Sequence, residues 1–361
     1  MRWAFVLVSY RRDAPAGMER STAALVQGLR LAGHEAFVVA AGPAPDDPAD
    51  EVVHLSSLRL PKAIHDEGLR EAIAHSAGLT AELREVTSTC DVVVWVDALW
   101  GLGAYAPPID ARSVLMVHVL GSALADLERA LARRPDVVIA PSGAVKQSAA
   151  RQLQPKTWRV VPNALLEPTI ERPSLRRRRR LREEGPVRIV ARLGPEKGVA
   201  PFLRVAAKRT DRHIEVALGD AGFELDGGSQ DAVRRECVDL ARGHSNVRIR
   251  DPLAWEEVPA FFADAALAVV PSCRESFGLV ALEAMSAGTP IVCFGVENLR
   301  VLPSGAGMIV EPAAGPSGLA DAMNAMLADP DAYIAAARQA RATALRYRAR
   351  AIADRFLAAA T

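Results

Sequence analysis

The chain of 361 residues lacks several features that mark other protein classes. No C-x-x-C pair occurs among its four cysteines, Cys90, Cys237, Cys273 and Cys293, so neither a disulfide framework nor a zinc site is predicted. The first apolar run is too short for a signal peptide, and no run reaches the roughly 18–20 apolar residues of a membrane span. We therefore expect a cytoplasmic protein with buried thiols and without stable membrane insertion.

An excess of charge of one sign is also missing. Lys and Arg together number 44 and Asp and Glu 43, which leaves a net charge of +1. A nearly neutral chain has no general field for nucleic acid, so we expect no nucleic-acid partner and only a local anion site. Lysine is scarce, with five residues against 39 arginines. The 50% of hydrophobic residues excludes a disordered chain.

What is present is a regular alternation of strands and helices. Continuous apolar runs, typical of strands buried on both faces, are separated by helical patterns, of which Glu19–Ala32 and Leu69–Val86 are the clearest in the first half. The second half repeats the alternation from Val187 and becomes wholly helical after Gly318, with breaks at Pro330 and near Tyr347. This α/β pattern predicts two doubly wound parallel-sheet domains, Rossmann-like, that face a cleft.

Composition predicts where the domains divide. Residues 1–168 form the N-terminal domain, 169–186 a linker, 187–345 the second domain, and 346–361 a separate C-terminal helix. Pro168, Pro173 and Pro186 lie around the arginine run Arg176–Arg180 at this division. Glu183 and Glu184 balance this run and no aromatic residue interleaves with it, so we interpret it as a solvated linker helix rather than a nucleic-acid site.

The segment Val269–Cys293 carries the strongest chemical signal. It predicts a strand, a loop with Glu275, and a helix that carries Glu283. Free backbone N–H groups at the start of a helix bind phosphate, and carboxylates beside them can hold sugar hydroxyls. The predicted N–H donors are Phe277, Gly278, Leu279 and Val280. The alternative for this segment is a surface helix with solvated glutamates.

Two further loops after predicted strands carry polar groups. Arg192 and Lys197 follow the strand Val187–Ala191, and two fixed cations there can neutralise a diphosphate leaving group. Gly17 precedes a helix and its backbone could face a phosphate, although a tight turn explains it equally well. His118 follows a strand and lies in the expected cleft, where a purely structural histidine is the alternative.

Several motifs together resemble the retaining glycosyltransferases of family 4, which have the GT-B fold. The family pattern E-G-F-G-L-x-x-x-E is similar to Glu275–Glu283, and R-L-x-x-x-K-G to Arg192–Gly198. G-G-x-E-R, S-x-x-x-K and V-x-P-N-G resemble Ala16–Arg20, Ser142–Lys146 and Val160–Ala164. The departures are Ala16, Ser276, Ala164 and the loop Gly219–Gly222, and this last one puts the base preference in doubt.

The resemblance implies roles for the matched residues. Glu275 would contact the donor sugar, Glu283 the ribose, and Arg192 with Lys197 the diphosphate, while His118 would lie near the sugar and acceptor. It also implies that the C-terminal helix packs back onto the N-terminal domain. The acceptor contacts that we predict are Asp13, Met18, Asp97 and Trp100. The sequence shows no metal-ligand cluster and no covalent nucleophile, so we expect neither a metal nor a cofactor.

The expected function is transfer of a sugar, with retention, from a nucleotide-diphosphate sugar to a hydroxyl group, and we expect the donor to be UDP-linked. We expect a small polar acceptor such as an aminocyclitol or another natural-product intermediate, and a monomer or homodimer. Three alternatives remain: a lipid acceptor of the phosphatidylinositol type, a nucleotide-sugar epimerase of the same architecture, and a silent nucleotide-sugar-binding regulator. A dehydrogenase is disfavoured because no G-x-G-x-x-G motif follows a strand.

Overall fold

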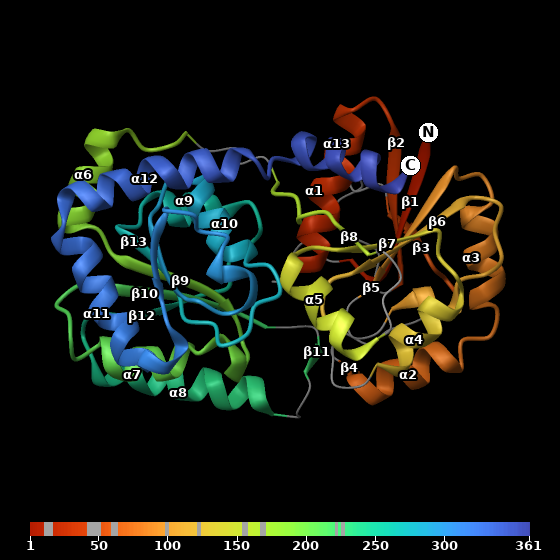
Figure 1. Ribbon diagram of the computed structural model, residues 1–361. Helices are drawn as coiled ribbons and strands as arrows, with labels where there is room; N and C mark the ends of the chain where they lie inside the picture. Colours follow the sequence, from red (N-terminus) through yellow and green to blue (C-terminus); the bar gives the residue numbers. More distant parts are fainter. Residues whose placement is uncertain are drawn as a thin grey trace. The chain divides into compact units, whose positions relative to one another are not determined.

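The computed structural model describes residues 1–10, 17–41, 52–58, 64–97, 101–120, 124–153, 158–166, 171–220, 223–224 and 228–361. Contacts divide the chain into two compact units (Figure 1). The N-terminal unit contains β1 (Arg2–Ser9), Gly17–Leu166 and the returning segment Tyr347–Thr361, and the second unit contains Glu167–Arg346.

The N-terminal unit is built on a seven-stranded sheet in the order β3-β2-β1-β5-β6-β7-β8. Neighbouring strands pair in parallel, and the strands β1 and β5 at its centre are continuous apolar runs that are buried on both faces. The strands are β1 (Arg2–Ser9), β2 (Glu35–Ala41), β3 (Val52–His54), β5 (Val92–Asp97), β6 (Arg112–Val117), β7 (Val137–Ala140) and β8 (Arg159–Val160). The helices are α1 (Gly17–Leu31), α2 (Asp66–Ala74), α3 (Leu79–Thr87), η1 (Leu102–Tyr105), α4 (Ala125–Ala132) and α5 (Gly143–Gln152).

The single helix predicted over Leu69–Val86 is wrong. The chain leaves α2 at Ala74 and enters α3 at Leu79. A side-chain contact fixes the turn between them, because the Ser76 hydroxyl donates to the Ser57 carbonyl at 2.5 Å. Ser57 lies 19 residues before Ser76 in the sequence, so the helical periodicity of this segment could not indicate the contact.

The second unit is built on a six-stranded parallel sheet in the order β12-β10-β9-β13-β14-β15. Its strands are β9 (Val187–Arg192), β10 (Ile214–Gly219), β12 (Val247–Arg250), β13 (Leu267–Val270), β14 (Ile291–Phe294) and β15 (Gly307–Val310). The helices are α6 (Leu175–Glu184), η2 (Pro195–Lys197), α7 (Val199–Ala206), α8 (Ser229–Gly243), α9 (Glu257–Ala263), α10 (Leu279–Ser286), η3 (Glu297–Arg300), η4 (Pro312–Ala314), α11 (Gly315–Ala328) and α12 (Pro330–Leu345). The short strands β4 (Ile64–His65) and β11 (Phe223–Glu224) belong to neither large sheet.

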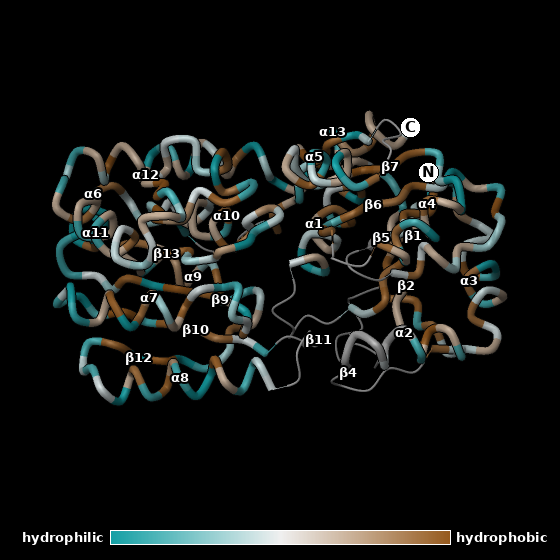
Figure 2. The backbone as a smooth tube through the Cα atoms, turned by 60° about the horizontal axis from the view of Figure 1, so that its bottom comes forward, coloured by the Kyte–Doolittle hydropathy of each residue, from teal (hydrophilic) through white to brown (hydrophobic). Residues whose placement is uncertain are grey.

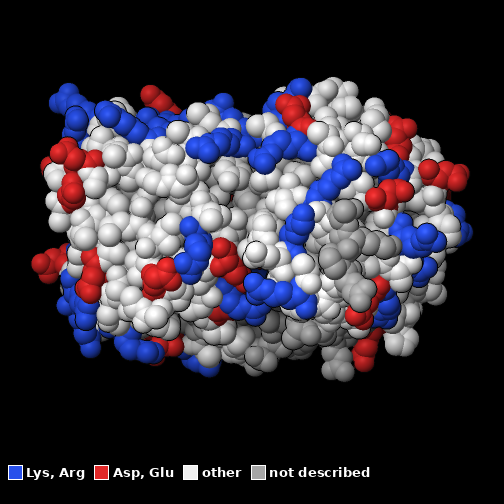
Figure 3. Space-filling view, viewed as in Figure 1, with Lys and Arg blue, Asp and Glu red and all other residues white. Residues whose placement is uncertain are grey.

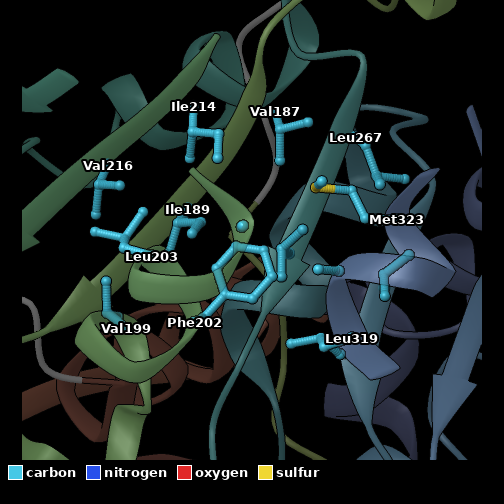
Figure 4. Packing of buried hydrophobic residues seen from close by; sticks show 14 of the residues in the cluster. Val187, Ile189, Val199, Phe202, Leu203, Ile214, Val216, Leu267, Leu319 and Met323 are labelled. Carbon is cyan, nitrogen blue, oxygen red and sulfur yellow. The ribbon is translucent and has the colours of Figure 1, made fainter. Parts of the chain in front are cut away.

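The core of the second unit lies between this sheet and its helices. Figure 4 shows Phe202 of α7 beside Ile189 of β9, with Leu319 and Met323 of α11 completing the packing. Along the tube of helix α8 in Figure 2, apolar and polar residues alternate, as expected for a helix with one face on a sheet. In the described part of the chain, no helix is long and apolar enough to cross a membrane.

The C-terminal helix α13 (Ala349–Ala360) returns to the N-terminal unit, which confirms the prediction from the resemblance. The Phe356 ring packs against Trp3 and Phe5 of β1, with ring centroids 5.7 and 6.0 Å apart. The Arg350 guanidinium donates to the Leu31 carbonyl at the end of α1, at 2.7 Å. The N-terminal unit is therefore completed by the last residues of the chain.

The solvated helix predicted around the arginine run is confirmed for Arg176, Arg177, Arg179 and Arg180, which are exposed, and is wrong for Arg178. The run forms α6, and the side chain of Arg178 is fully buried in the second unit. Its guanidinium donates to the carbonyls of Ala265 and Ala287, each at 2.8 Å, just beyond the ends of α9 and α10. These carbonyls have no partner within their own helices, so the buried cation satisfies them. Figure 3 shows basic side chains near α6 and side chains of both signs elsewhere on the same face.

Candidate active site

The second unit brings two loops together where the strand order reverses. From β9 the chain adds β10 and β12 toward one edge, and from β13 it adds β14 and β15 toward the other. The strands β9 and β13 are direct neighbours, with Leu267 paired to Val187. The loops after them therefore leave the same edge of the sheet side by side, which is where doubly wound folds bind their ligands.

The loop after β9 packs tightly against the loop after β13. Gly198 has a φ of +65°, and a Cβ atom there would lie 2.2 Å from the Pro271 carbonyl oxygen. Glycine is required at this position both for the left-handed backbone and for the close approach. The Cys273 N–H donates to the Glu196 carbonyl at 2.8 Å and links the two loops. The main chains of both loops are thus fixed against each other.

Two predicted site residues, Lys197 and Glu275, meet across these loops. The Lys197 Nζ lies 2.8 Å from Glu275 Oε2, and the two side chains are only 18% and 17% exposed. Removal of either partner would leave the other as a largely shielded, uncompensated charge. The structure therefore joins the cation predicted for the diphosphate to the carboxylate predicted for the sugar.

Arg192 is also paired, but in a more exposed contact. Its Nη2 lies 2.8 Å from Glu196 Oε1, four residues later, and the side chains are 42% and 31% exposed. Exposed pairs of this kind contribute about 0–1 kcal/mol, so an incoming phosphate can replace Glu196 at low cost. Glu196 was not predicted as a site residue, although its place in the loop between Arg192 and Lys197 is a signal that could have identified it.

The loop after β14 also forms hydrogen bonds with the segment around Glu275. The Glu297 carboxylate accepts a hydrogen bond from the Glu275 backbone N–H at 2.5 Å, and the Asn298 side-chain amide donates to the Phe277 carbonyl at 2.7 Å. Sequence reasoning missed both residues. The available signal was that they follow the strand β14, which neighbours β13.

The helix α10 begins directly after this segment. Gly278 precedes it with a φ of +99°, and a Cβ atom there would lie 2.6 Å from a methyl group of Leu299. The first N–H groups of α10, from Leu279 and Val280, have no acceptor within the helix and favour an anion. Glu283 lies inside α10 and is 7% exposed, so its carboxylate is buried rather than solvated as the surface-helix alternative required.

Four of the remaining predicted residues, Gly17, Met18, Asp97 and His118, belong to the N-terminal unit. Gly17 and Met18 begin α1, and Asp97 ends β5, a direct neighbour of β1 in the sheet. Asp13 and Trp100 lie outside the described residues.

His118 follows β6 and is 6% exposed, and burial lowers its pKa from 6.5 to about 4. Its imidazole is therefore neutral at pH 7.

The prediction of four buried thiols is wrong at one position. Cys273, in the loop after β13, is exposed, whereas Cys90, Cys237 and Cys293 are buried. Burial raises the pKa of Cys237 to about 11 and that of Cys293 to about 12. The loop that carries Cys273 approaches the β9 loop instead of entering the core, which explains the exposed thiol.

Within the part of the chain that the structure describes, no cluster of three or more His, Cys, Asp or Glu residues could hold a metal.

Comparison with known families matches both units. Residues 187–329 fit the family model described as glycosyl transferases group 1, and residues 15–165 fit the model described as glycosyltransferase family 4. The chain belongs to glycosyltransferase family 4. The first match contains Arg192, Lys197, Glu275 and Glu283, and the second contains Gly17 and His118.

Curated relatives of this family-4 chain include the D-inositol 3-phosphate glycosyltransferase of Corynebacterium jeikeium. The two are 34% identical over 170 residues, which is 46% of this chain and 40% of the relative. The match therefore spans about two fifths of that relative's length.

Solved structures resemble the chain over almost its whole length. A sucrose-phosphate synthase from Thermosynechococcus elongatus gives a TM-score of 0.73 at 20% identity, and covers 99% of this chain and 98% of that one. Anabaena HepE in complex with UDP and glucose gives 0.72 at 20% identity, with the same coverage. At this identity the likeness shows the fold, which is the predicted GT-B architecture of two Rossmann-like domains.

Proposed function

We propose that the chain transfers a sugar from a nucleoside-diphosphate sugar to a hydroxyl group of a small polar acceptor. The observation that supports this most strongly is the Lys197–Glu275 pair, at 2.8 Å, at the point where the strand order of the second unit reverses. A nucleotide-sugar donor needs a cation for its diphosphate and an acceptor of hydrogen bonds for its sugar hydroxyls, and this pair supplies both within one contact.

Departure of the diphosphate is the step that the second unit would assist. Negative charge develops on the phosphate oxygen as the bond to the sugar breaks, and fixed cations and N–H donors stabilise it without reorganisation. We assign this role to Arg192, Lys197 and the backbone of Phe277–Val280. Arg192 would exchange its exposed partner Glu196 for a phosphate oxygen, whereas Lys197 would keep Glu275.

The sugar and ribose are assigned to the two carboxylates. Glu275 would accept hydrogen bonds from sugar hydroxyls and hold the ring while it acquires positive charge. The buried Glu283 would accept from ribose hydroxyls. In a retaining mechanism without a covalent nucleophile, the departing phosphate takes the proton of the attacking hydroxyl on the same face of the sugar. No metal or cofactor is required in this scheme.

The N-terminal unit would supply the acceptor contacts. His118 is assigned to the sugar and acceptor, and its neutral imidazole can accept or donate a hydrogen bond at pH 7. Gly17 would face a phosphate, and Asp13, Met18, Asp97 and Trp100 would contact the acceptor. These assignments follow from the family resemblance and from the positions of the loops after strands.

The proposed donor is UDP-linked and the proposed acceptor is a cyclitol. The name of the Corynebacterium relative specifies an inositol phosphate, which is a cyclitol, and Anabaena HepE was solved in complex with UDP and glucose. An aminocyclitol or a related natural-product intermediate remains the specific proposal. We place the reaction in the cytoplasm, with the protein acting as a monomer or homodimer.

The test is a panel of UDP-, GDP- and dTDP-sugars, first without an acceptor and then with inositol phosphate or aminocyclitols. Slow hydrolysis of one donor identifies the nucleotide and the sugar together, and proton NMR of the transferred product reports the configuration at the anomeric carbon. We expect a UDP-sugar to be consumed and the configuration to be retained. Release of an isomerised donor would instead identify an epimerase, and absence of turnover with every donor would reject the proposed function.

A further inference from the structure

Glu297 has an unusual backbone conformation for its residue type. Among the described residues outside glycine, only Arg134, Glu297 and Ser304 have a positive φ, and that of Glu297 is +43°. A residue with a Cβ atom is strained in this region, and such strain persists only where the surroundings hold it in place. Residues of this kind are concentrated at functional sites.

The contacts of η3 show what holds Glu297. Its carboxylate accepts from the Glu275 N–H at 2.5 Å, across 22 residues of sequence. A hydrogen bond to an ionised acceptor is shorter and stronger than one between neutral groups. The next residue, Asn298, donates to the Phe277 carbonyl at 2.7 Å. The first two residues of η3 therefore form hydrogen bonds with the loop after β13 at both ends of Glu275–Phe277.

We propose that Glu297 is a positioning residue of the donor site, which fixes the backbone of Glu275 before the donor binds. The inference rests on the proposed function. Lys197 holds the Glu275 carboxylate and Glu297 holds its main chain, so the group assigned to the sugar is anchored at both ends. Preorganisation of this kind lowers the barrier of the chemical step more than it improves donor binding.

Substitution by glycine separates the backbone conformation of Glu297 from the hydrogen bond of its carboxylate. Glu297→Gly permits the positive φ without strain but removes the carboxylate. If Glu297 were needed only for its backbone conformation, this substitution would therefore leave kcat unchanged. Ser304→Gly is the matched control. Ser304 has a φ of +44° and lies in the same segment after β14, yet it is exposed, and the hydrogen bonds that hold the Glu275 loop come from Glu297 and Asn298.

The experiment compares the wild type with Glu297→Gly, Glu297→Gln and Ser304→Gly. We measure kcat and KM for the donor that the panel identifies, the melting temperature, and hydrogen exchange at the Glu275 amide. Glu297→Gly relieves the backbone strain but loses the hydrogen bond, so its melting temperature should change little. It should lose about 10- to 100-fold in kcat with a KM change below about threefold, and exchange at Glu275 at least about 10-fold faster. Glu297→Gln should retain most activity, because its amide oxygen still accepts the hydrogen bond.

Ser304→Gly should leave kcat and the exchange rate at Glu275 unchanged. Wild-type kcat and exchange in Glu297→Gly would overturn the proposal, and so would an equal loss of kcat in Ser304→Gly. The exchange measurement needs no turnover, so it distinguishes the two failures. Unchanged exchange in Glu297→Gly rejects the positioning contact, whereas a wild type that consumes no donor rejects the proposed function.

Discussion

The Lys197 ammonium lies 2.8 Å from the Glu275 carboxylate, although 78 residues separate the two in the sequence. An ammonium has three N–H donors, and this contact uses one of them, so others remain for phosphate oxygens. A single lysine can therefore link the carboxylate assigned to the sugar with the diphosphate that leaves it. The contact exists because β9 and β13 are neighbours in the sheet and release their loops at the same edge.

Replacement of Lys197 should lower turnover far more than stability, although the loss of the ammonium also leaves the Glu275 carboxylate uncompensated and lowers the melting temperature. Lys197→Ala removes a cation that faces developing negative charge, and a loss of about 2–4 kcal/mol in transition-state stabilisation corresponds to about 30- to 1,000-fold in kcat. The measurement is kcat together with the melting temperature. Lys208→Ala, at an exposed lysine of the same unit, is the control and should leave both unchanged. Unchanged kcat with a lowered melting temperature in Lys197→Ala would show a structural role.

Turnover should persist in EDTA. Arg192, Lys197 and the first N–H groups of α10 already supply positive charge to the diphosphate, so the proposed mechanism does not need a divalent cation. Initial rates are compared before and after dialysis against the chelator, and again after addition of Mg²⁺ or Mn²⁺. Loss of activity in the chelator with recovery on adding metal would contradict the assignment of the cations.

Cys273 should report on donor binding. It is the exposed thiol among the four cysteines, and its backbone is hydrogen-bonded to Glu196 at the proposed diphosphate site. A thiol reagent should label one equivalent quickly, because burial raises the pKa values of Cys90, Cys237 and Cys293 and disfavours their reactive thiolates. Saturating UDP should slow the labelling. Cys273→Ser should abolish the fast phase, and a rate that is insensitive to UDP would argue against binding at this loop.

His118 should make the protein sensitive to acid. Its folded pKa of about 4 is lower than the unfolded value of 6.5, so the unfolded state binds more protons between these values. The associated stability is fully present above pH 6.5 and is lost as the pH falls toward 4. Relative to His118→Asn, the wild type should lose about 2–3 kcal/mol of unfolding free energy between about pH 7 and about pH 4.5. Urea titrations of both proteins at the two pH values measure this, and parallel losses would disprove the shift.

The alternation of elements could be predicted from the sequence because strands of parallel sheets are buried on both faces. Trp3–Val8 and Leu267–Val270 are continuous apolar runs, and both are strands. The interruption between α2 and α3 could not be predicted, since it depends on the distant contact of Ser76 with Ser57. The burial of Arg178 could not be predicted either, because its acceptors are carbonyls just beyond the ends of two helices, 87 and 109 residues further along the chain.

The sequence could predict part of the candidate site but not the contacts between its residues. Arg192, Lys197, Glu275 and Glu283 could be singled out, because each lies in a loop or helix that follows a predicted strand. The partner of each charge could not be named, since the Lys197–Glu275 and Glu297–Glu275 contacts depend on the order of strands in the sheet. Glu297 carries no local motif, and only its backbone conformation and its hydrogen bond distinguish it from a surface glutamate.

The most direct test of a diphosphate site between the loops after β9 and β13 is calorimetric titration of UDP. We compare the wild type, the double variant Arg192→Ala/Lys197→Ala, and Lys208→Ala. The wild type and Lys208→Ala should bind one equivalent with equal affinity. The double variant should bind at least about 150-fold more weakly, because each of the two charge-assisted contacts contributes about 1.5–3 kcal/mol. Equal affinity in all three proteins, or no binding of UDP to the wild type, would contradict the site.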